Sequence, residues 1–197
     1  GTEQSSGSKL LSIAGDVERP GIFEVPWGTT VREVLKLAGA GSVKAVQVGG
    51  PSGELISPKE LDRRIAFEDL PCAGAIAVFN ESRDLLEVVV NYAHFFAHES
   101  CGFCTPCRVG THVATRSLDK LRQGRGSSAE LAELGTLTRL LRDTSHCGLG
   151  NTAPNAWRHY LDKFPDDLAR RLQAGFVPAF DVDAALVAAR TARGETP

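Results

Sequence analysis

The sequence contains no methionine in 197 residues, and it has no apolar run near the ~20 residues of a membrane helix. It opens in a Gly/Ser-rich stretch that lacks the basic start and apolar core of a secretory signal. Because an initiator residue is missing, we interpret the chain as a fragment or a processed product. If its start is the true one, we expect a cytoplasmic protein with no direct membrane insertion.

Charge and glycine patterns exclude two further kinds of site. The formal net charge is -2, without the clustered excess of Lys and Arg that phosphate backbones attract, so we expect no nucleic-acid partner. No GxGxxG or GxxxxGK[ST] motif follows an apolar run, so neither a dinucleotide site nor a P-loop is visible. The glycines at 39–41 and 49–50 are interpreted as turns.

Short apolar runs separated by turn residues occupy residues 9–80. We predict strands at KLLSIAG, GIFEVP, AVQVGG, ELISP and GAIAVFN. The segment VREVLKLAG has helical spacing instead, with Thr29 or Thr30 as its N-cap and Gly39 or Gly41 at its end. Together these elements predict a compact α+β domain.

The hydrophobic period becomes helical after that domain. We predict four antiparallel helices joined by short loops, which form a small bundle. Their expected spans are 82–100 with Ser82 as N-cap, 105–124 with Thr105 as N-cap, 127 to the Cys147 loop from a Ser127/Glu130 capping box, and 154–164 before Pro165. The side chains expected to face inward are Leu85, Leu86, Val89, Tyr92, Phe95, Phe96, Val109, Val113, Leu118, Leu131, Leu134, Leu137, Leu140, Leu141, Trp157, Tyr160 and Leu161.

The fold class is therefore α+β with two domains. We expect the first domain over residues 1–81 and the helical bundle over residues 82–174. A tail over residues 175–197 is expected to pack on the outside, with a short helix near residues 183–193.

Four of the five cysteines have the spacing of an iron–sulfur site. Cys101, Cys104 and Cys107 form a C-x-x-C-x-x-C run, and Cys147 follows after a long insertion. A cubane cluster needs four thiolates on four irons, and one compact loop supplies three of them while a distant residue supplies the last. We therefore predict a [4Fe–4S] cluster on these four cysteines and interpret Cys72 as a small buried side chain.

The neighbours of the ligands suit a negatively charged cluster. Arg108 is a candidate charge partner, although a solvated helix residue is an equal alternative. Gly102, Gly148 and Gly150 would let backbone N–H groups approach the cluster, although turn geometry alone also explains them. We expect a helix N-terminus at Thr105 to add positive dipole.

Other interpretations of the same cysteines remain open at this point. Structural zinc could accept four thiolates, although two consecutive C-x-x steps favour a cubane. A thioredoxin-like dithiol would leave two cysteines unexplained. We assign no ligand role to the five histidines, which are His94, His98, His112, His146 and His159.

The segments HESCGFCTPCRVGT and SHCGLGNTAPN resemble the cluster-binding segment of the NADH-oxidising flavoprotein subunit of respiratory complex I. Soluble relatives with this segment are the diaphorase subunit of NAD-reducing hydrogenases and the beta subunit of NAD-dependent formate dehydrogenases. GDVERPGIFEVPWG and CAGAIAVFNES resemble the preceding domain of this family, a soluble-ligand-binding β-grasp domain. The four cysteines fall on the family's ligand positions, and PAFDVDAAL looks closer to the hydrogenase and formate dehydrogenase branch.

The resemblance implies a one-electron relay between FMN and further iron–sulfur clusters. FMN and NAD are expected on a missing domain or a partner chain, because nothing in these residues matches the family's flavin and NADH sites. Other expected partners are the iron–sulfur subunits of a hydrogenase, formate dehydrogenase or complex I-like assembly. We expect no catalytic residue in this chain, which would be part of an oxidoreductase. The alternative function is a non-redox ligand-binding or scaffolding module with structural zinc.

Overall fold

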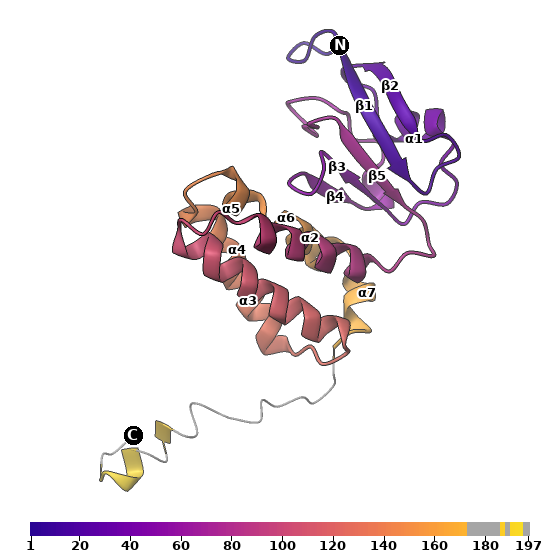
Figure 1. The fold of residues 1–197 in the computed structure, drawn as a ribbon. Helices are drawn as coiled ribbons and strands as arrows, with labels where there is room; N and C mark the ends of the chain where they lie inside the picture. Colours follow the sequence, from indigo (N-terminus) through magenta and orange to yellow (C-terminus); the bar gives the residue numbers. More distant parts are fainter. Residues whose placement is uncertain (173–185, 188–189, 195–197) are drawn as a thin grey trace.

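A five-stranded mixed sheet forms the first part of the chain (Figure 1). The computed structural model describes residues 1–172, 186–187 and 190–194. The five predicted strand segments are all strands, in the spatial order β2-β1-β5-β3-β4, with β1 and β5 parallel and the other neighbours antiparallel. Their bounds are β1 Ser8–Gly15, β2 Gly21–Pro26, β3 Ala45–Val48, β4 Glu54–Ile56 and β5 Ala75–Phe79.

Helix α1, Val31–Ala38, covers one face of this sheet. Thr30 is its N-cap and forms a reciprocal capping box with Glu33. Gly39 ends the helix at φ 70°, a left-handed conformation that glycine adopts without a Cβ penalty. The predicted helix and its cap residues are therefore found as expected.

Strands β3 and β4 are buried on both faces. Val46 and Ile56 belong to the core beneath α1, whereas Ala45 and Leu55 belong to the core of the helices that follow. Because successive side chains of a strand point to opposite faces, one short apolar run can serve two cores. The helices that follow therefore pack against the face of the sheet opposite α1.

Six further helices follow the sheet in the described residues. Helix α2 begins after Asp84, whose carboxylate accepts the N–H groups of Leu86 and Glu87, so the expected cap at Ser82 is wrong. Ser82 instead bonds to Asn80 in the preceding turn. The bounds are α2 Leu85–Glu99, α3 Thr105–Arg122, α4 Ser128–Thr144, α5 Gly148–Thr152, α6 Asn155–Lys163 and α7 Pro165–Ala169.

Two short helices, α5 and α7, were not predicted. Pro165 does follow the end of α6, but it also occupies the first turn of α7. Proline suits that position because the first turn of a helix has no intrahelical partner for its N–H. The expectation that Pro165 only stops a helix was therefore incomplete.

Three of the side chains expected to face inward are largely exposed. Phe95, Val109 and Leu140 are 45–48% exposed. Phe96 and Leu141 are buried as predicted, and Gly110, next to Val109, is buried as well. A Cβ at Gly110 would lie 3.2 Å from the Leu141 side chain, so α3 and α4 approach closely there. Trp157 and Tyr160 are fully buried as predicted.

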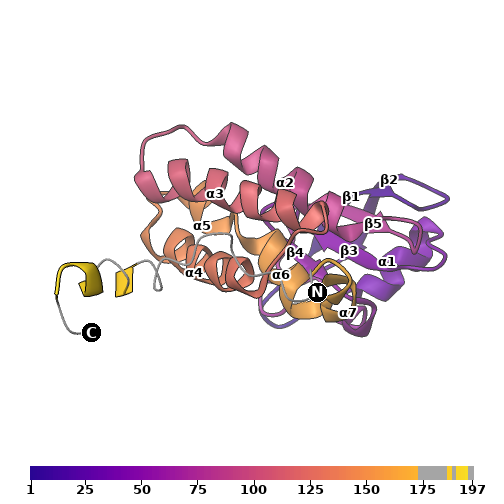
Figure 2. The same cartoon turned by 90° about the horizontal axis from the view of Figure 1, so that it is seen from below.

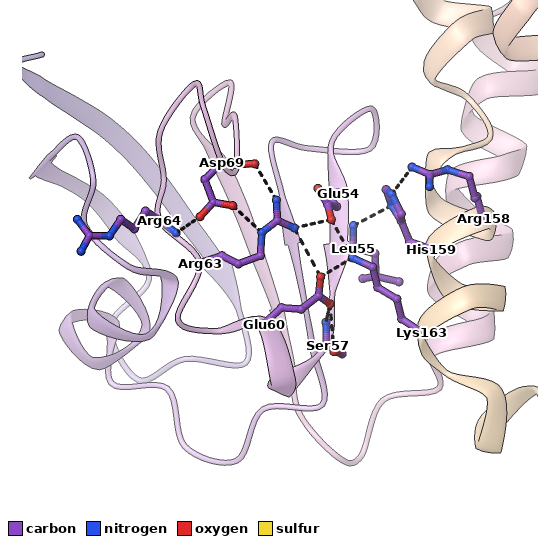
Figure 3. A network of polar contacts seen from close by, with 10 residues as sticks. All are labelled: Glu54, Leu55, Ser57, Glu60, Arg63, Arg64, Asp69, Arg158, His159 and Lys163. Atoms are coloured by element: carbon purple, nitrogen blue, oxygen red, sulfur yellow. Dashed lines mark hydrogen bonds and ion pairs between the residues drawn. The ribbon is translucent and has the colours of Figure 1, made fainter. Parts of the chain in front are cut away.

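A polar network joins the sheet to α6 (Figure 3). Lys163 Nζ lies 2.8 Å from a carboxylate oxygen of Glu54 and of Glu60, and Arg63 also contacts Glu54 at 2.6 Å. His159 Nδ1 accepts the backbone N–H of Leu55 at 3.3 Å. Hence the sheet and the helices are held by paired charges as well as by apolar packing.

The tail helix expected near residues 183–193 lies partly outside the described residues. Residues 186–187 and 190–192 are helical. The expected packing of the tail concerns residues beyond those described. Among the helices that the structure describes, none has both the length and the apolar character of a bilayer span.

Candidate metal centre

The four predicted cysteine ligands line one cavity of about 400 Å³. Cys101 and Cys104 lie in the loop between α2 and α3, Cys107 lies in the first turn of α3, and Cys147 directly precedes α5. The hairpin of α3 and α4 returns the chain to this end of the molecule. Figure 2 shows α5 between α3 and α4, which both contact it.

Two of the cysteines are helix N-caps. Cys104 is the N-cap of α3, and Cys147 is the N-cap of α5. Thr105 is therefore the first residue of α3 and not its cap, contrary to expectation. The first turn of α3 contains Cys107 and borders the cavity, so the positive end of this 18-residue helix faces it.

Exposure varies across the four thiols. Cys107 is 5% exposed, Cys104 is half-buried, and Cys101 and Cys147 are exposed. One side of the cavity is thus closed by protein and the other opens to solvent. The open side lies at the exposed pair.

Local donors and charges affect the thiols differently. The backbone N–H groups of His146 and Cys107 lower the pKa of Cys104, since they stabilise its thiolate. Burial raises the pKa of Cys107, and the proximity of the other three thiolates raises it further against the lowering effect of Ser100. All four cysteines line the same cavity, so the charges of their thiolates act on one another.

Arg108 stabilises the loop between α2 and α3, which carries Cys101 and Cys104. Its guanidinium donates to the carbonyl oxygens of Gly102 and Phe103 and to Thr105 Oγ1. Arg108 is exposed, and its bonds fix the path of the backbone between Cys101 and Cys104. Its expected role as a charge partner stays a prediction.

The three predicted glycines have different surroundings. Gly102 has φ 78°, which a residue with a side chain rarely adopts. A Cβ at Gly148 would meet no atom within 4 Å. A Cβ at Gly150, in contrast, would lie 2.4 Å from Ser145 Oγ and 3.1 Å from Cys107 Cβ. Only Gly150 is required for close packing beside a cysteine.

An unpaired hydroxyl lies beside the buried cysteine. Ser145 Oγ is buried and has no hydrogen-bond partner within the described part of the chain. Buried hydroxyl groups normally have a partner, but Ser145 is not among the residues that line the cavity. The four thiols of the cavity and the N–H groups beside Cys104 fit an anionic sulfur-rich group.

Sequence reasoning missed several residues of the cavity wall. Phe103 and His146 line the opening with ring centroids 5.3 Å apart, and Glu99, Ser100 and Leu149 complete the lining. Adjacency to a cysteine was the only available signal for them. A larger hollow of about 590 Å³ along α3 has no cysteine in its wall.

The remaining candidates lie away from this site. Cys72 is 5% exposed in the core of the sheet, and Gly74 N–H donates to its sulfur at 3.3 Å. His94 pairs with Asp119 at 3.3 Å, and His159 belongs to the network at the sheet.

Two families of known proteins match the chain. Residues 87–171 match the NADH-ubiquinone oxidoreductase-F iron-sulfur binding region, and residues 10–54 match the SLBB domain. The first match contains all four cysteines of the cavity. The fold and the site therefore define a class of protein in which an SLBB domain precedes a [4Fe–4S]-binding domain.

Individual proteins are similar to this chain over nearly its whole length. The NAD-reducing hydrogenase HoxS subunit alpha of Cupriavidus necator is 44% identical over 190 residues, which are 94% of this chain and 32% of that protein. An NADH-quinone oxidoreductase subunit of Aquifex aeolicus is 35% identical over 172 residues, which are 85% and 40% of the two chains. A crystal structure of an NAD+-reducing [NiFe]-hydrogenase in the H2-reduced state has a TM-score of 0.87 and 43% identity, and it covers 100% of this chain and 35% of its own.

The chain spans about a third of the length of the hydrogenase relatives it matches. It belongs to the family of NADH-oxidising flavoprotein subunits and corresponds to their C-terminal region.

Proposed function

We propose that this chain is a one-electron relay that holds one [4Fe–4S] cluster on Cys101, Cys104, Cys107 and Cys147. The observation that carries this proposal is the convergence of the four thiols on one cavity of about 400 Å³. When bound, such a cluster stores and releases single electrons, and four cysteines leave no iron open to a substrate.

The surrounding chain compensates the negative charge of the cluster. The N–H groups of His146 and Cys107 point to Cys104, and the N-terminus of α3 adds positive dipole. Arg108 and Gly102 hold the loop in shape, and Gly150 lets the Cys147 segment approach Cys107. Electrons exchange at the open side, where Cys101 and Cys147 are exposed beside Phe103.

Structural zinc on the same cysteines is the alternative. A zinc ion needs four ligands that surround one point, with sulfurs at about 2.3 Å. No three His, Cys, Asp or Glu side chains of the described residues form a group that could hold one ion. The four corners of a cubane separate its thiolates more widely, and the two consecutive C-x-x steps from Cys101 to Cys107 favour the cluster.

We also propose the two-domain architecture that the resemblance to this family implies. The order β2-β1-β5-β3-β4 with a helix on one face supports a β-grasp-like domain over residues 1–81. Helices α2, α3, α4 and α6 support a four-helix bundle over residues 82–174, followed by a tail over residues 175–197.

FMN and NAD belong to a domain or chain beyond these residues, because the sequence has no glycine-rich phosphate-binding motif. The relatives are subunits of an NAD-reducing hydrogenase and of an NADH-quinone oxidoreductase, which supports partner subunits in a hydrogenase or complex I-like assembly. A formate dehydrogenase is a further candidate. Electrons then pass from reduced FMN through this chain to other iron–sulfur subunits, or in reverse.

Anaerobic reconstitution with iron and sulfide tests the relay. We expect a brown protein that dithionite bleaches and that NADH alone does not. A colourless protein with one bound zinc would support the alternative function. Rapid reduction by NADH without an added flavoprotein would reveal a nucleotide site in this chain and contradict the relay proposal.

Two equally buried cysteines test the ligand set. Cys107 and Cys72 are each 5% exposed, so alanine at either position removes a similar contact with protein. We expect Cys107→Ala to lose iron and colour and Cys72→Ala to retain four irons per chain. Loss of the cluster from a folded Cys72→Ala variant would show that the ligand set is wrong.

A further inference from the structure

Ser100 is the residue that connects α2 to the first cysteine of the cavity. Its Oγ lies 3.3 Å from Cys107 Sγ, seven residues further along the chain. The backbone N–H of Gly102 also contacts this Oγ, at 3.4 Å. Ser100 therefore has one hydrogen-bond donor and one sulfur as its neighbours.

The direction of the contact with sulfur follows from these two neighbours. A backbone N–H can only donate, so Ser100 Oγ is the acceptor of the Gly102 bond. The hydroxyl proton remains available, and a metal-bound thiolate carries no proton of its own. Ser100 is consequently the donor and Cys107 Sγ is the acceptor.

The burial of Cys107 makes this hydrogen bond important for its sulfur. Cys107 is buried, whereas Cys101 and Cys147 are exposed to water that can solvate their sulfurs. A hydrogen bond to a charged group is stronger where water is excluded. Among the four sulfurs, Cys107 therefore depends most on a protein donor.

We propose that Ser100 is a positioning residue that raises the reduction potential of the cluster through its hydrogen bond to Cys107. The inference rests on the proposed cluster. Reduction adds one electron, which increases the negative charge shared by irons, sulfides and thiolates. A donor at sulfur stabilises this reduced state more than the oxidised state, and hydrogen bonds to sulfur are one of the factors that set such potentials.

Redox titration of the reconstituted chain, followed by visible absorption and EPR, measures the effect. Ser100→Ala removes the donor, and we expect its reduction equilibrium to become about tenfold less favourable, which is about 59 mV for one electron. Ser100→Thr keeps a hydroxyl and should retain the wild-type potential. Thr144→Val removes an exposed hydroxyl that donates to the carbonyl of Leu140 outside the cavity lining, and it should not shift the potential.

The outcomes separate this inference from the proposed function. A wild-type protein without a one-electron cluster signal would overturn both. A wild-type signal with equal potentials in the wild-type, Ser100→Ala and Ser100→Thr proteins would overturn only the role of Ser100. If Ser100→Ala binds no cluster, Ser100→Gly is titrated instead. Loss of the cluster from both hydroxyl-free variants would assign Ser100 to assembly and overturn its effect on the potential.

Discussion

At the scale of single residues, the two glycines of α5 differ sharply although they are two positions apart. Gly150 packs between Ser145 and the buried Cys107, whereas Gly148 faces open space. Since both lie in the same short helix, alanine at either position has the same effect on helix propensity. The difference between the two variants therefore isolates packing beside the cluster.

We predict that Gly150→Ala reduces the cluster content and destabilises the protein by about 1–3 kcal/mol, because the added methyl group must displace Ser145 or Cys107. Gly148→Ala should retain its iron and its stability. Iron and sulfide analysis after reconstitution, together with denaturant unfolding, measures both effects. Equal cluster content in the two variants would contradict this packing role.

At the scale of secondary-structure elements, α4 matters because it leads the chain to Cys147. Ser127 and Glu130 form its capping box, in which Ser127 N–H donates to Glu130 Oε2 at 3.0 Å and Glu130 N–H donates to Ser127 Oγ at 3.3 Å. Lys120 of α3 pairs with Glu130 at 2.6 Å, so the cap also joins two helices. The start of α4 is thus fixed by local and by tertiary contacts.

Replacement of this cap should destabilise the helical part of the protein. We expect Ser127→Ala to lower the free energy of unfolding by about 1 kcal/mol, because an N–H group at the helix start loses its partner. Ser128→Ala is the control, since Ser128 is exposed and next in the chain. Urea unfolding of both variants measures the difference, and an effect of the same size in the control would contradict the capping role.

The elements also show how far sequence reasoning extends. The capping box at Ser127 and the helix from Thr30 to Gly39 were predictable because their signals are local. Helices α5 and α7 have five residues each, too few for a hydrophobic period to be recognised. The exposure of Phe95 depends on which neighbouring element packs against α2, and that information is tertiary.

The candidate site was likewise predictable from the sequence only in part. The C-x-x-C-x-x-C spacing predicted which thiols would meet, and the structure places all four at one cavity. The contact of Ser100 with Cys107 crosses a loop of seven residues, and no periodic pattern indicates it. Spacing therefore predicts ligands better than it predicts the groups that surround them.

At the scale of the whole molecule, the network around Lys163 connects the sheet with α6 (Figure 3). Burial raises the pKa of Glu54 and Glu60, but hydrogen bonds from Lys163, together with Arg63 and Ser57, outweigh it and lower both pKa values. Burial, with the charges of Arg158 and Lys163, lowers the pKa of His159 to about 4. At neutral pH the carboxylates are thus ionised and the imidazole is neutral.

We predict that Lys163→Met lowers stability by about 1–2 kcal/mol at pH 7, since the two carboxylates lose a shared cation. A lowered carboxyl pKa stabilises the folded state above the unfolded value near ~4.3 and ceases to do so as pH falls through the folded pKa. The difference between wild type and variant should therefore shrink below about pH 4. Lys59→Met is the control, because exposed Lys59 has no ion pair among the described residues. A constant difference from pH 7 to pH 3 would contradict the ionic role.

Removal of iron should also destabilise the helices, at the cysteine site instead of at the network with the sheet. The four thiols come from two loops that only the folded helices bring together, so binding of a cluster stabilises the fold. We predict that anaerobic chelation lowers the melting temperature. The helices should lose stability first, because the four thiols lie on helical segments and their connecting loops and not on the sheet. Calorimetry with far-UV circular dichroism measures this change, and Cys72→Ala protein serves as a control that should respond as the wild type does.

In Lys163→Met protein, which has a weaker connection between sheet and helices, chelation should separate the melting into two transitions. An unchanged melting temperature in fully iron-free wild-type protein would contradict the coupling between the cluster and the fold.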